Sequence, residues 1–121
     1  MNNLTVTILR RGFLLLVAGG IFYLSSQPSL SIVPPLFPNQ DKVFHMLEYL
    51  FLFVAMFTNR MVYRGPYPFG AMFAVGLLYA VTDEIHQSFV PGRDCSVLDL
   101  AADAAGLAIG LVICLSYLRK R

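Results

Sequence analysis

Four apolar stretches, separated by polar segments, form the hydropathy pattern of the chain. A helix needs about 20 predominantly apolar residues to cross the hydrocarbon core of a bilayer. The third and fourth stretches reach this length by themselves, whereas the first and second need their polar flanks. The pattern predicts four transmembrane helices, over about residues 5–25, 42–59, 69–89 and 97–118.

Clusters of proline, glycine and serine mark the breaks between these stretches. Ser25-Ser26-Gln27-Pro28 follows the first stretch, while Arg64-Gly65-Pro66 and Pro91-Gly92 separate the later ones. Such clusters between apolar runs are typical of loops. With no internal repeat and no low-complexity tract, we expect one all-α domain over residues 1–121, an integral membrane four-helix bundle.

The composition favours lipid as the solvent of this chain. Charged residues make up 13% and hydrophobic residues 57%, against about 25% charged residues in a typical soluble domain. The net charge is +2, and no basic stripe with interleaved aromatics appears, so we exclude a nucleic-acid partner. Membrane lipids are the expected surroundings. The two cysteines offer no disulfide framework, because Cys95 is expected in a loop and Cys114 deep in the last helix.

The positions of the cations indicate an orientation. Four spans place seven of the nine lysines and arginines on one side, namely Arg10, Arg11, Arg60, Arg64, Arg119, Lys120 and Arg121. The opposite side has only Lys42 and Arg93. By the positive-inside rule, both termini are cytoplasmic. We therefore expect a multi-pass protein of the cytoplasmic (inner) membrane.

A cleaved signal peptide is the competing interpretation of the first stretch. Arg10-Arg11, the apolar run and Ser25-Ser26 loosely match that pattern. An A-x-A-like cleavage site is missing, and the charge distribution agrees best with four retained helices. Four retained helices are therefore our interpretation.

All acidic residues lie away from the three segments that carry most of the cations, around residues 10–11, 60–64 and 119–121. They are Asp41, Glu48, Asp83, Glu84, Asp94, Asp99 and Asp103. Acidic residues contribute little to orientation, and an ionisable residue at the centre of a membrane helix costs about 2.5–3.5 kcal/mol. We expect those within the apolar stretches to lie near the outer boundary and to face the bundle interior.

Helical spacing places many polar residues together at the outer end of the predicted bundle. Steps of three or four residues place side chains on one helix face. The loop over residues 90–94 adds Arg93, whose alternative role is an ion pair with Asp94 or Asp99. The resulting mixed-charge set comprises Lys42, His45, Tyr49, Asp83, Glu84, Gln87, Arg93, Asp99 and Asp103. Below Asp99 and Asp103, Gly106 and Gly110 continue the same stripe as a small-xxx-small pattern, which lets helices approach closely in lipid.

Four motifs in a fixed order carry a family resemblance. They are Asp41-Lys42-x-x-His45-x-x-x-Tyr49, Tyr79-x-x-x-Asp83-Glu84-x-x-Gln87, Phe89-Val90-Pro91-Gly92-Arg93 and Asp99-x-x-x-Asp103-x-x-Gly106. This ordered set, over roughly residues 20–115, resembles the VanZ-like family of small bacterial membrane proteins. Asp103 stands where Asn is also common. The resemblance implies a four-helix membrane protein and a link with resistance to the glycopeptide teicoplanin, but it implies no reaction.

Our first hypothesis is an outward-facing cleft that binds or processes an anionic amphiphile or a cell-envelope precursor. Lys42 and Arg93 would hold the anionic head, while His45 with Asp83 or Glu84 would move a proton, as a catalytic site requires. The groups that would orient the substrate are Tyr49, Gln87, Asp99 and Asp103. Whether a reaction follows binding, and so whether the protein is an enzyme, stays open.

Other hypotheses assign the polar residues different roles. In a non-enzymatic binding or assembly module, the charged cluster is a structural lock, with His45 paired to Asp41 or Glu48. The Gly106 and Gly110 face would then contact a partner helix or a second copy in a homo-oligomer. A proton-coupled carrier is a third hypothesis, and it requires an oligomer because four helices form no pore alone.

Two short motifs could suggest a metal site. His45-x-x-Glu48 and Asp83-Glu84-x-His86 resemble the Glu-x-x-His pairs that build di-metal sites in helix bundles. Here the order of residues is reversed and each motif is short. We therefore expect no metal and no other cofactor.

Overall fold

A computed structural model of the chain describes residues 1–28, 34–59 and 68–121. Across these ranges the regular structure consists of four α helices: α1 (Asn3–Ser25), α2 (Gln40–Thr58), α3 (Pro68–Gln87) and α4 (Val97–Arg119). The prediction of an all-α fold with four helices is confirmed, and every predicted helix limit is within two residues of the observed one. The predicted loop at Arg64-Gly65-Pro66, together with Arg60, lies outside the described residues.

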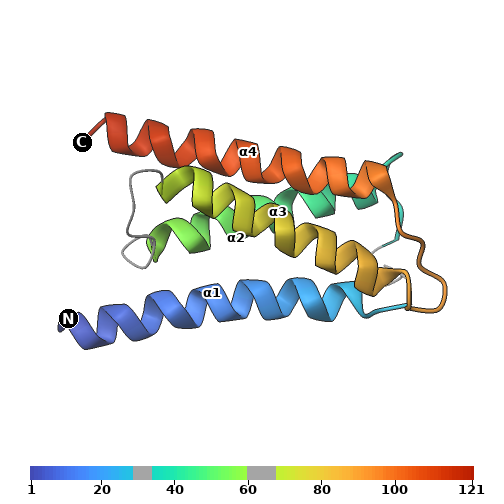
Figure 1. Cartoon of the computed structure of the whole chain (residues 1–121), viewed down its shortest axis with the longest axis horizontal. Helices are drawn as coiled ribbons and strands as arrows, with labels where there is room; N and C mark the ends of the chain where they lie inside the picture. Colours follow the sequence, from blue (N-terminus) through green and yellow to red (C-terminus); the bar gives the residue numbers. More distant parts are fainter. Residues whose placement is uncertain (29–33, 60–67) are drawn as a thin grey trace.

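The helices run alternately up and down the bundle (Figure 1). Both chain ends lie at one end, on the left in the view, where α1 and α4 form opposite edges and α2 and α3 lie between them. The connection from α3 to α4 lies at the far end. Both termini therefore lie at the same end, as an even number of antiparallel helices requires; which side of the membrane that end faces stays a prediction.

Three helices, α1, α3 and α4, are long and apolar enough to cross a membrane. In α2, by contrast, Asp41, Lys42 and Glu48 interrupt the apolar sequence. Only Ile21 and Ser25 are buried in α1, whose large apolar side chains are otherwise mostly exposed. Exposed apolar surface on this scale is unusual for a protein in water but suits a helix that faces lipid.

Two glycines let α4 approach α2 closely. A Cβ atom on Gly106 would overlap the carbonyl oxygen of Met46, and one on Gly110 would come within 2.8 Å of Phe53 Cβ. Both glycines are buried against α2 of the same chain. This corrects the expectation that their face is free for a second copy, because α2 already covers it. A homo-oligomer would need another surface.

The helix termini determine where the polar residues meet. α2 begins after Asn39, which has a left-handed backbone conformation (φ 59°). α4 begins at the Ser96 cap, whose side-chain oxygen accepts a hydrogen bond from the Asp99 backbone N–H at 3.3 Å. The starts of α2 and α4 thus lie beside the ends of α1 and α3, at the end of the bundle far from the chain termini (Figure 1).

Candidate functional site

Polar side chains from all four helices are buried together at this end. We call them the polar cluster, and its members are Ser25, Lys42, His45, Tyr49, Asp83, Glu84, Gln87, Asp99 and Asp103. Lys42 is half-buried, and every other member is at most 8% exposed. The structure therefore brings together all of the predicted site residues except Arg93. The prediction missed Ser25.

His45 links α2 to α4 through carboxylates. Its Nδ1 atom lies 2.9 Å from Asp103 Oδ1, and its Nε2 atom lies 3.8 Å from Asp99 Oδ2. These partners differ from Asp41 and Glu48, the residues on its own helix that the lock hypothesis assigned to it. An imidazole between two buried carboxylates is well placed to carry a proton.

Lys42 forms ion pairs with carboxylates on two helices. Its Nζ atom donates to Asp99 Oδ1 on α4 and to Asp41 Oδ2, at 2.6 Å, on its own helix. With two carboxylate partners, its charge is already compensated. Lys42 is thus a poorer candidate than expected for holding an anionic head group.

Asp83 joins the end of α3 to the end of α1. Ser25 Oγ donates to Asp83 Oδ1, and Gln87 Nε2 donates to Asp83 Oδ2 at 3.3 Å. Both carboxylate oxygens therefore have a donor. The only sequence signal for Ser25 was a pair of serines after an apolar run, which reads equally well as a loop.

The two carboxylate oxygens of Glu84 differ: Oε2 accepts a hydrogen bond, whereas Oε1 has no partner among the described residues. The Ser96 backbone N–H donates to Glu84 Oε2 at 3.0 Å. Asp83 and Glu84 also lie in the last turns of α3, where the helix dipole disfavours negative charge. Their position is therefore unfavourable for the isolated helix, and the surrounding groups have to compensate for it.

Four buried polar atoms of the cluster have no hydrogen-bond partner among the described residues. They are Tyr49 OH, Glu84 Oε1, Gln87 Oε1 and Asp103 Oδ2. Leaving a buried polar group unsatisfied costs about 1–3 kcal/mol. Native proteins leave few such groups, and each of them needs an explanation. Because all four occur in one cluster, a bound molecule, an ion or ordered water would satisfy them together.

Arg93 lies at the edge of the polar cluster, after the turn at Gly92 (φ 80°). Its side chain is half-buried, and within the described ranges no carboxylate forms an ion pair with it at 4 Å or less. It is close enough to Glu48 for their charges to interact. An ion pair of Arg93 with Asp94 or Asp99, the alternative to a ligand-binding role, is likewise not formed within the described ranges, and Asp99 pairs with Lys42 instead.

The histidine of the Asp83-Glu84-x-His86 motif lies apart from the cluster. His86 stacks on Phe22 with a centroid distance of 4.7 Å, and its Nε2 atom lies 2.9 Å from Ser26 Oγ. A different grouping appears across three helices: possible ligand atoms of His45, Glu84 and Asp103 all lie within 4.8 Å of one another.

An apolar pocket of about 270 Å³ lies between α1, α2 and α3. It is lined by Leu14, Leu15, Ala18, Leu52, Met56, Val75, Gly76 and Tyr79. Leu52 lies about one turn from Tyr49, and Tyr79 about one turn from Asp83, so the pocket borders the polar cluster on the side of the bundle centre. The Tyr79 hydroxyl donates to the Ala18 carbonyl at 2.6 Å.

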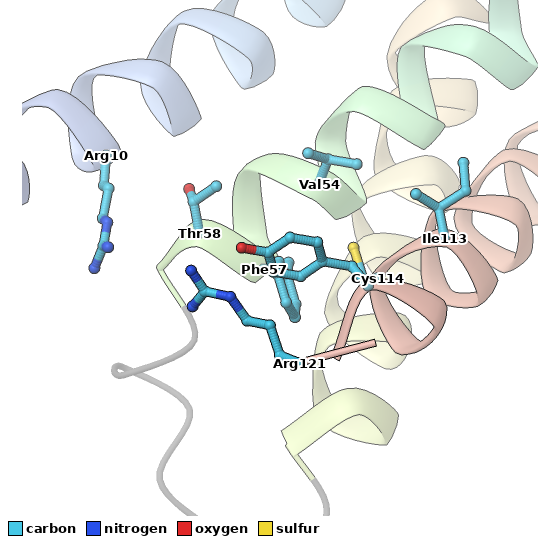
Figure 2. A pocket seen from close by; sticks show the side chains of 8 residues that line it. Arg10, Val54, Phe57, Thr58, Ile113, Cys114 and Arg121 are labelled. Atoms are coloured by element: carbon cyan, nitrogen blue, oxygen red, sulfur yellow. The ribbon is translucent and has the colours of Figure 1, made fainter. Parts of the chain in front are cut away.

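A larger pocket, of about 490 Å³, lies near the chain termini. Figure 2 shows Arg10, from α1, and Arg121, beyond α4, at its rim on the side of Thr58. Arg121 lies over the Tyr117 ring, 5.4 Å from the centroid. The described lining includes none of the predicted site residues. The cations at this end and the carboxylates at the other give the bundle two ends of opposite charge.

The sequence matches the VanZ/LLP1 family over residues 11–119, a segment that contains the whole polar cluster. No curated protein and no solved structure matches the chain. The family match covers nearly the whole length, and three of the described helices are long and apolar enough to cross a bilayer. This chain is therefore a membrane protein that belongs to the VanZ/LLP1 family.

Proposed function

We propose that the polar cluster and the apolar pocket beside it form a binding site for an anionic amphiphile, with a lipid-linked or other cell-envelope precursor as the ligand. The observation that carries the proposal is the set of four buried polar atoms without partners in one cluster. The site would open to the outer face of the cytoplasmic membrane. The link with teicoplanin resistance that the family resemblance implies belongs to this proposal, and it depends on the ligand being an envelope precursor.

The unpartnered atoms favour a head group that donates hydrogen bonds. Glu84 Oε1, Gln87 Oε1 and Asp103 Oδ2 are all acceptors, so a ligand that satisfies them has to donate hydrogen bonds. Sugar hydroxyls and peptide N–H groups are such donors. Arg93 supplies the positive charge for a phosphate or carboxylate on the same head, since a guanidinium binds either group in a bidentate manner.

The apolar pocket supplies a place for the tail. Its position beside the polar cluster would let one molecule place its head among the carboxylates and part of its chain between α1, α2 and α3. Burial of an acyl chain stabilises binding by about 0.8 kcal/mol for each CH₂ group. A soluble head group without a tail is therefore expected to bind more weakly.

If a reaction follows binding, His45 and Glu84 are the residues that we assign to proton transfer. His45 lies between two carboxylates of α4. Of the two acidic residues on α3, Asp83 has donors on both oxygens, whereas Glu84 has one oxygen free. Glu84 is accordingly the better acceptor of a proton from a bound head group.

The structural lock is the alternative, and it accounts for part of the cluster. Lys42 with Asp99, His45 with Asp103 and Ser25 with Asp83 each join two helices. Such bonds would stabilise a non-enzymatic assembly module equally well. The four buried polar atoms without partners distinguish a binding site from a structural lock. An atom that forms no hydrogen bond does not join two helices.

Arg93→Ala is the variant that tests this proposal. Native mass spectrometry and lipid analysis of the detergent-solubilised protein would compare wild type, Arg93→Ala and the control Arg119→Ala, which removes the same charge from the opposite end. We expect a ligand with a defined head group in wild type and in the control, and at least a tenfold loss of occupancy in Arg93→Ala. If all three proteins are folded and carry only bulk lipid, the binding function is wrong and the lock is favoured.

A further inference from the structure

We infer that His45, Glu84 and Asp103 form a binding site for a divalent transition-metal cation, of the Zn²⁺ or Mn²⁺ class. The three residues come from α2, α3 and α4, and all are buried. One possible ligand atom from each lies within 4.8 Å of the other two. No pair of them is adjacent in the sequence, which is why spacing along single helices did not reveal the grouping.

Glu84 and Asp103 each use one carboxylate oxygen in a hydrogen bond or ion pair and retain the other. His45 lies against Asp103 through Nδ1 and 3.8 Å from Asp99 Oδ2 through Nε2, so a cation would replace one of these two contacts. Glu84 accepts from Ser96 N–H through Oε2, while Oε1 has no partner within the described part of the chain. Asp103 contacts His45 through Oδ1, while Oδ2 is likewise unpartnered. Metal ligands are commonly oriented by such outer hydrogen bonds, which leave the coordinating atom free.

The distances require only a small adjustment. Ligand atoms of a tetrahedral site with bonds of about 2.1 Å lie about 3.4 Å apart. Bringing a pair at the 4.8 Å limit to this separation takes a movement of about 1.4 Å. Rotation of the Glu84 side chain about its own bonds would have to supply this movement while Oε2 stays near Ser96 N–H.

The charge of the cluster also favours a cation. Asp83, Glu84, Asp99 and Asp103 are buried, and a buried charge without compensation is strongly destabilising. Within the described residues, Lys42 and His45 are the basic groups paired with these carboxylates. A divalent ion would compensate the remaining negative charge.

Two further buried groups without partners lie on the same helix faces as the proposed ligands. Tyr49 OH and Gln87 Oε1 are buried without partners, and their residues are less than 2% exposed. Tyr49 follows His45 by four positions and Gln87 follows Glu84 by three, so each shares the helix face of a proposed ligand. Either group could hydrogen-bond a water molecule on the cation.

The donor set restricts the kind of metal. Mg²⁺ and Ca²⁺ prefer sites made of oxygen atoms, whereas an imidazole with two carboxylates suits Zn²⁺ or Mn²⁺. Three protein ligands also leave a coordination position open. The metal site depends only on this geometry. With the cation bound, Glu84 Oε1 and Asp103 Oδ2 coordinate it instead of accepting hydrogen bonds from a head group, and the idea that the cation then holds the anionic head rests on the proposed function.

Metal binding can be measured without any amphiphile, so that its failure and the failure of the proposed function are separate results. Tag-free, chelator-treated full-length protein would be titrated with Zn²⁺ and with Mn²⁺ by calorimetry, with Mg²⁺ as a comparison. The isosteric variants are Glu84→Gln and Asp103→Asn. Asp94→Asn is the control, because it removes an exposed carboxylate from the same end.

We expect one Zn²⁺ or Mn²⁺ per chain, at least tenfold weaker affinity in Glu84→Gln and in Asp103→Asn, and a change below twofold in Asp94→Asn. Absence of saturable binding by folded wild type would overturn the site, as would equal affinity in all variants. If a variant does not fold, pulsed electron paramagnetic resonance of Mn²⁺ on wild type decides: a coupled imidazole nitrogen supports the site, and its absence contradicts it.

Discussion

Tyr49 and Tyr79 show the difference between a polar group that serves the fold and one that does not. Their ring centroids are 6.3 Å apart. The Tyr79 hydroxyl donates to the Ala18 carbonyl and so ties α3 to α1. The Tyr49 hydroxyl is buried and has no partner among the described residues. A fold that needed only packing at Tyr49 would be at least as stable with phenylalanine there.

Helical spacing predicted which residues gather at the polar end, but it could not predict how they pair. Spacing specifies the helix face on which His45 lies, and that face turned out to contact Asp103 on another helix. Ser25 escaped prediction for the same reason, because its role depends on Asp83, which is distant in sequence. Pairings across helices follow from tertiary packing, which a single sequence read by periodicity does not specify.

At the scale of elements, the close contact of α2 with α4 sets the geometry of the site. It holds Lys42 and His45 against Asp99 and Asp103, and it depends on Gly106 lying directly on the backbone of α2. A side chain at Gly106 would meet backbone atoms of Met46 and Leu50, which cannot rotate away.

Gly106→Leu is therefore expected to separate α2 from α4 and to lower the free energy of unfolding by about 3 kcal/mol or more, at or above the upper end of overpacking effects. Unfolding by a denaturing detergent, followed by circular dichroism, measures this change. Gly19→Leu is the matched control, since a Cβ at Gly19 has no neighbour within 4 Å. Equal stability of both variants would show that the α2–α4 contact is looser than described.

Hydropathy predicted the number of helices and their limits well, because apolar length is a local property of the sequence. It was less informative about the partner of each helix. The Gly106 and Gly110 stripe indicated a close approach, but a stripe of small residues does not identify the helix that packs on it. The structure assigns it to α2 in the same chain.

At the scale of the whole molecule, charge is divided between the two ends of the bundle. The carboxylates of the polar cluster lie at one end, while Arg10 and Arg121 line a pocket at the other. The positive-inside rule predicts that the polar cluster faces outward.

The two cysteines make this orientation measurable. Cys95 is exposed in the connection between α3 and α4, whereas Cys114 is buried. A membrane-impermeant maleimide should label Cys95 in intact cells from which any outer membrane has been removed, and Cys95→Ser should abolish the labelling. Labelling that appears only after the inner membrane is permeabilised would reverse the orientation and place the proposed site in the cytoplasm.

The central claim is that the unpartnered groups of the polar cluster serve a ligand rather than the fold. The most direct measurement is the free energy of unfolding of Tyr49→Phe and Tyr79→Phe, both freed of ligand, relative to wild type. We predict that Tyr79→Phe loses about 0.5–1.5 kcal/mol, the usual contribution of one hydrogen bond, and that Tyr49→Phe loses nothing or gains stability. An equal loss in Tyr49→Phe would contradict the claim, because its hydroxyl would then be part of a structural lock.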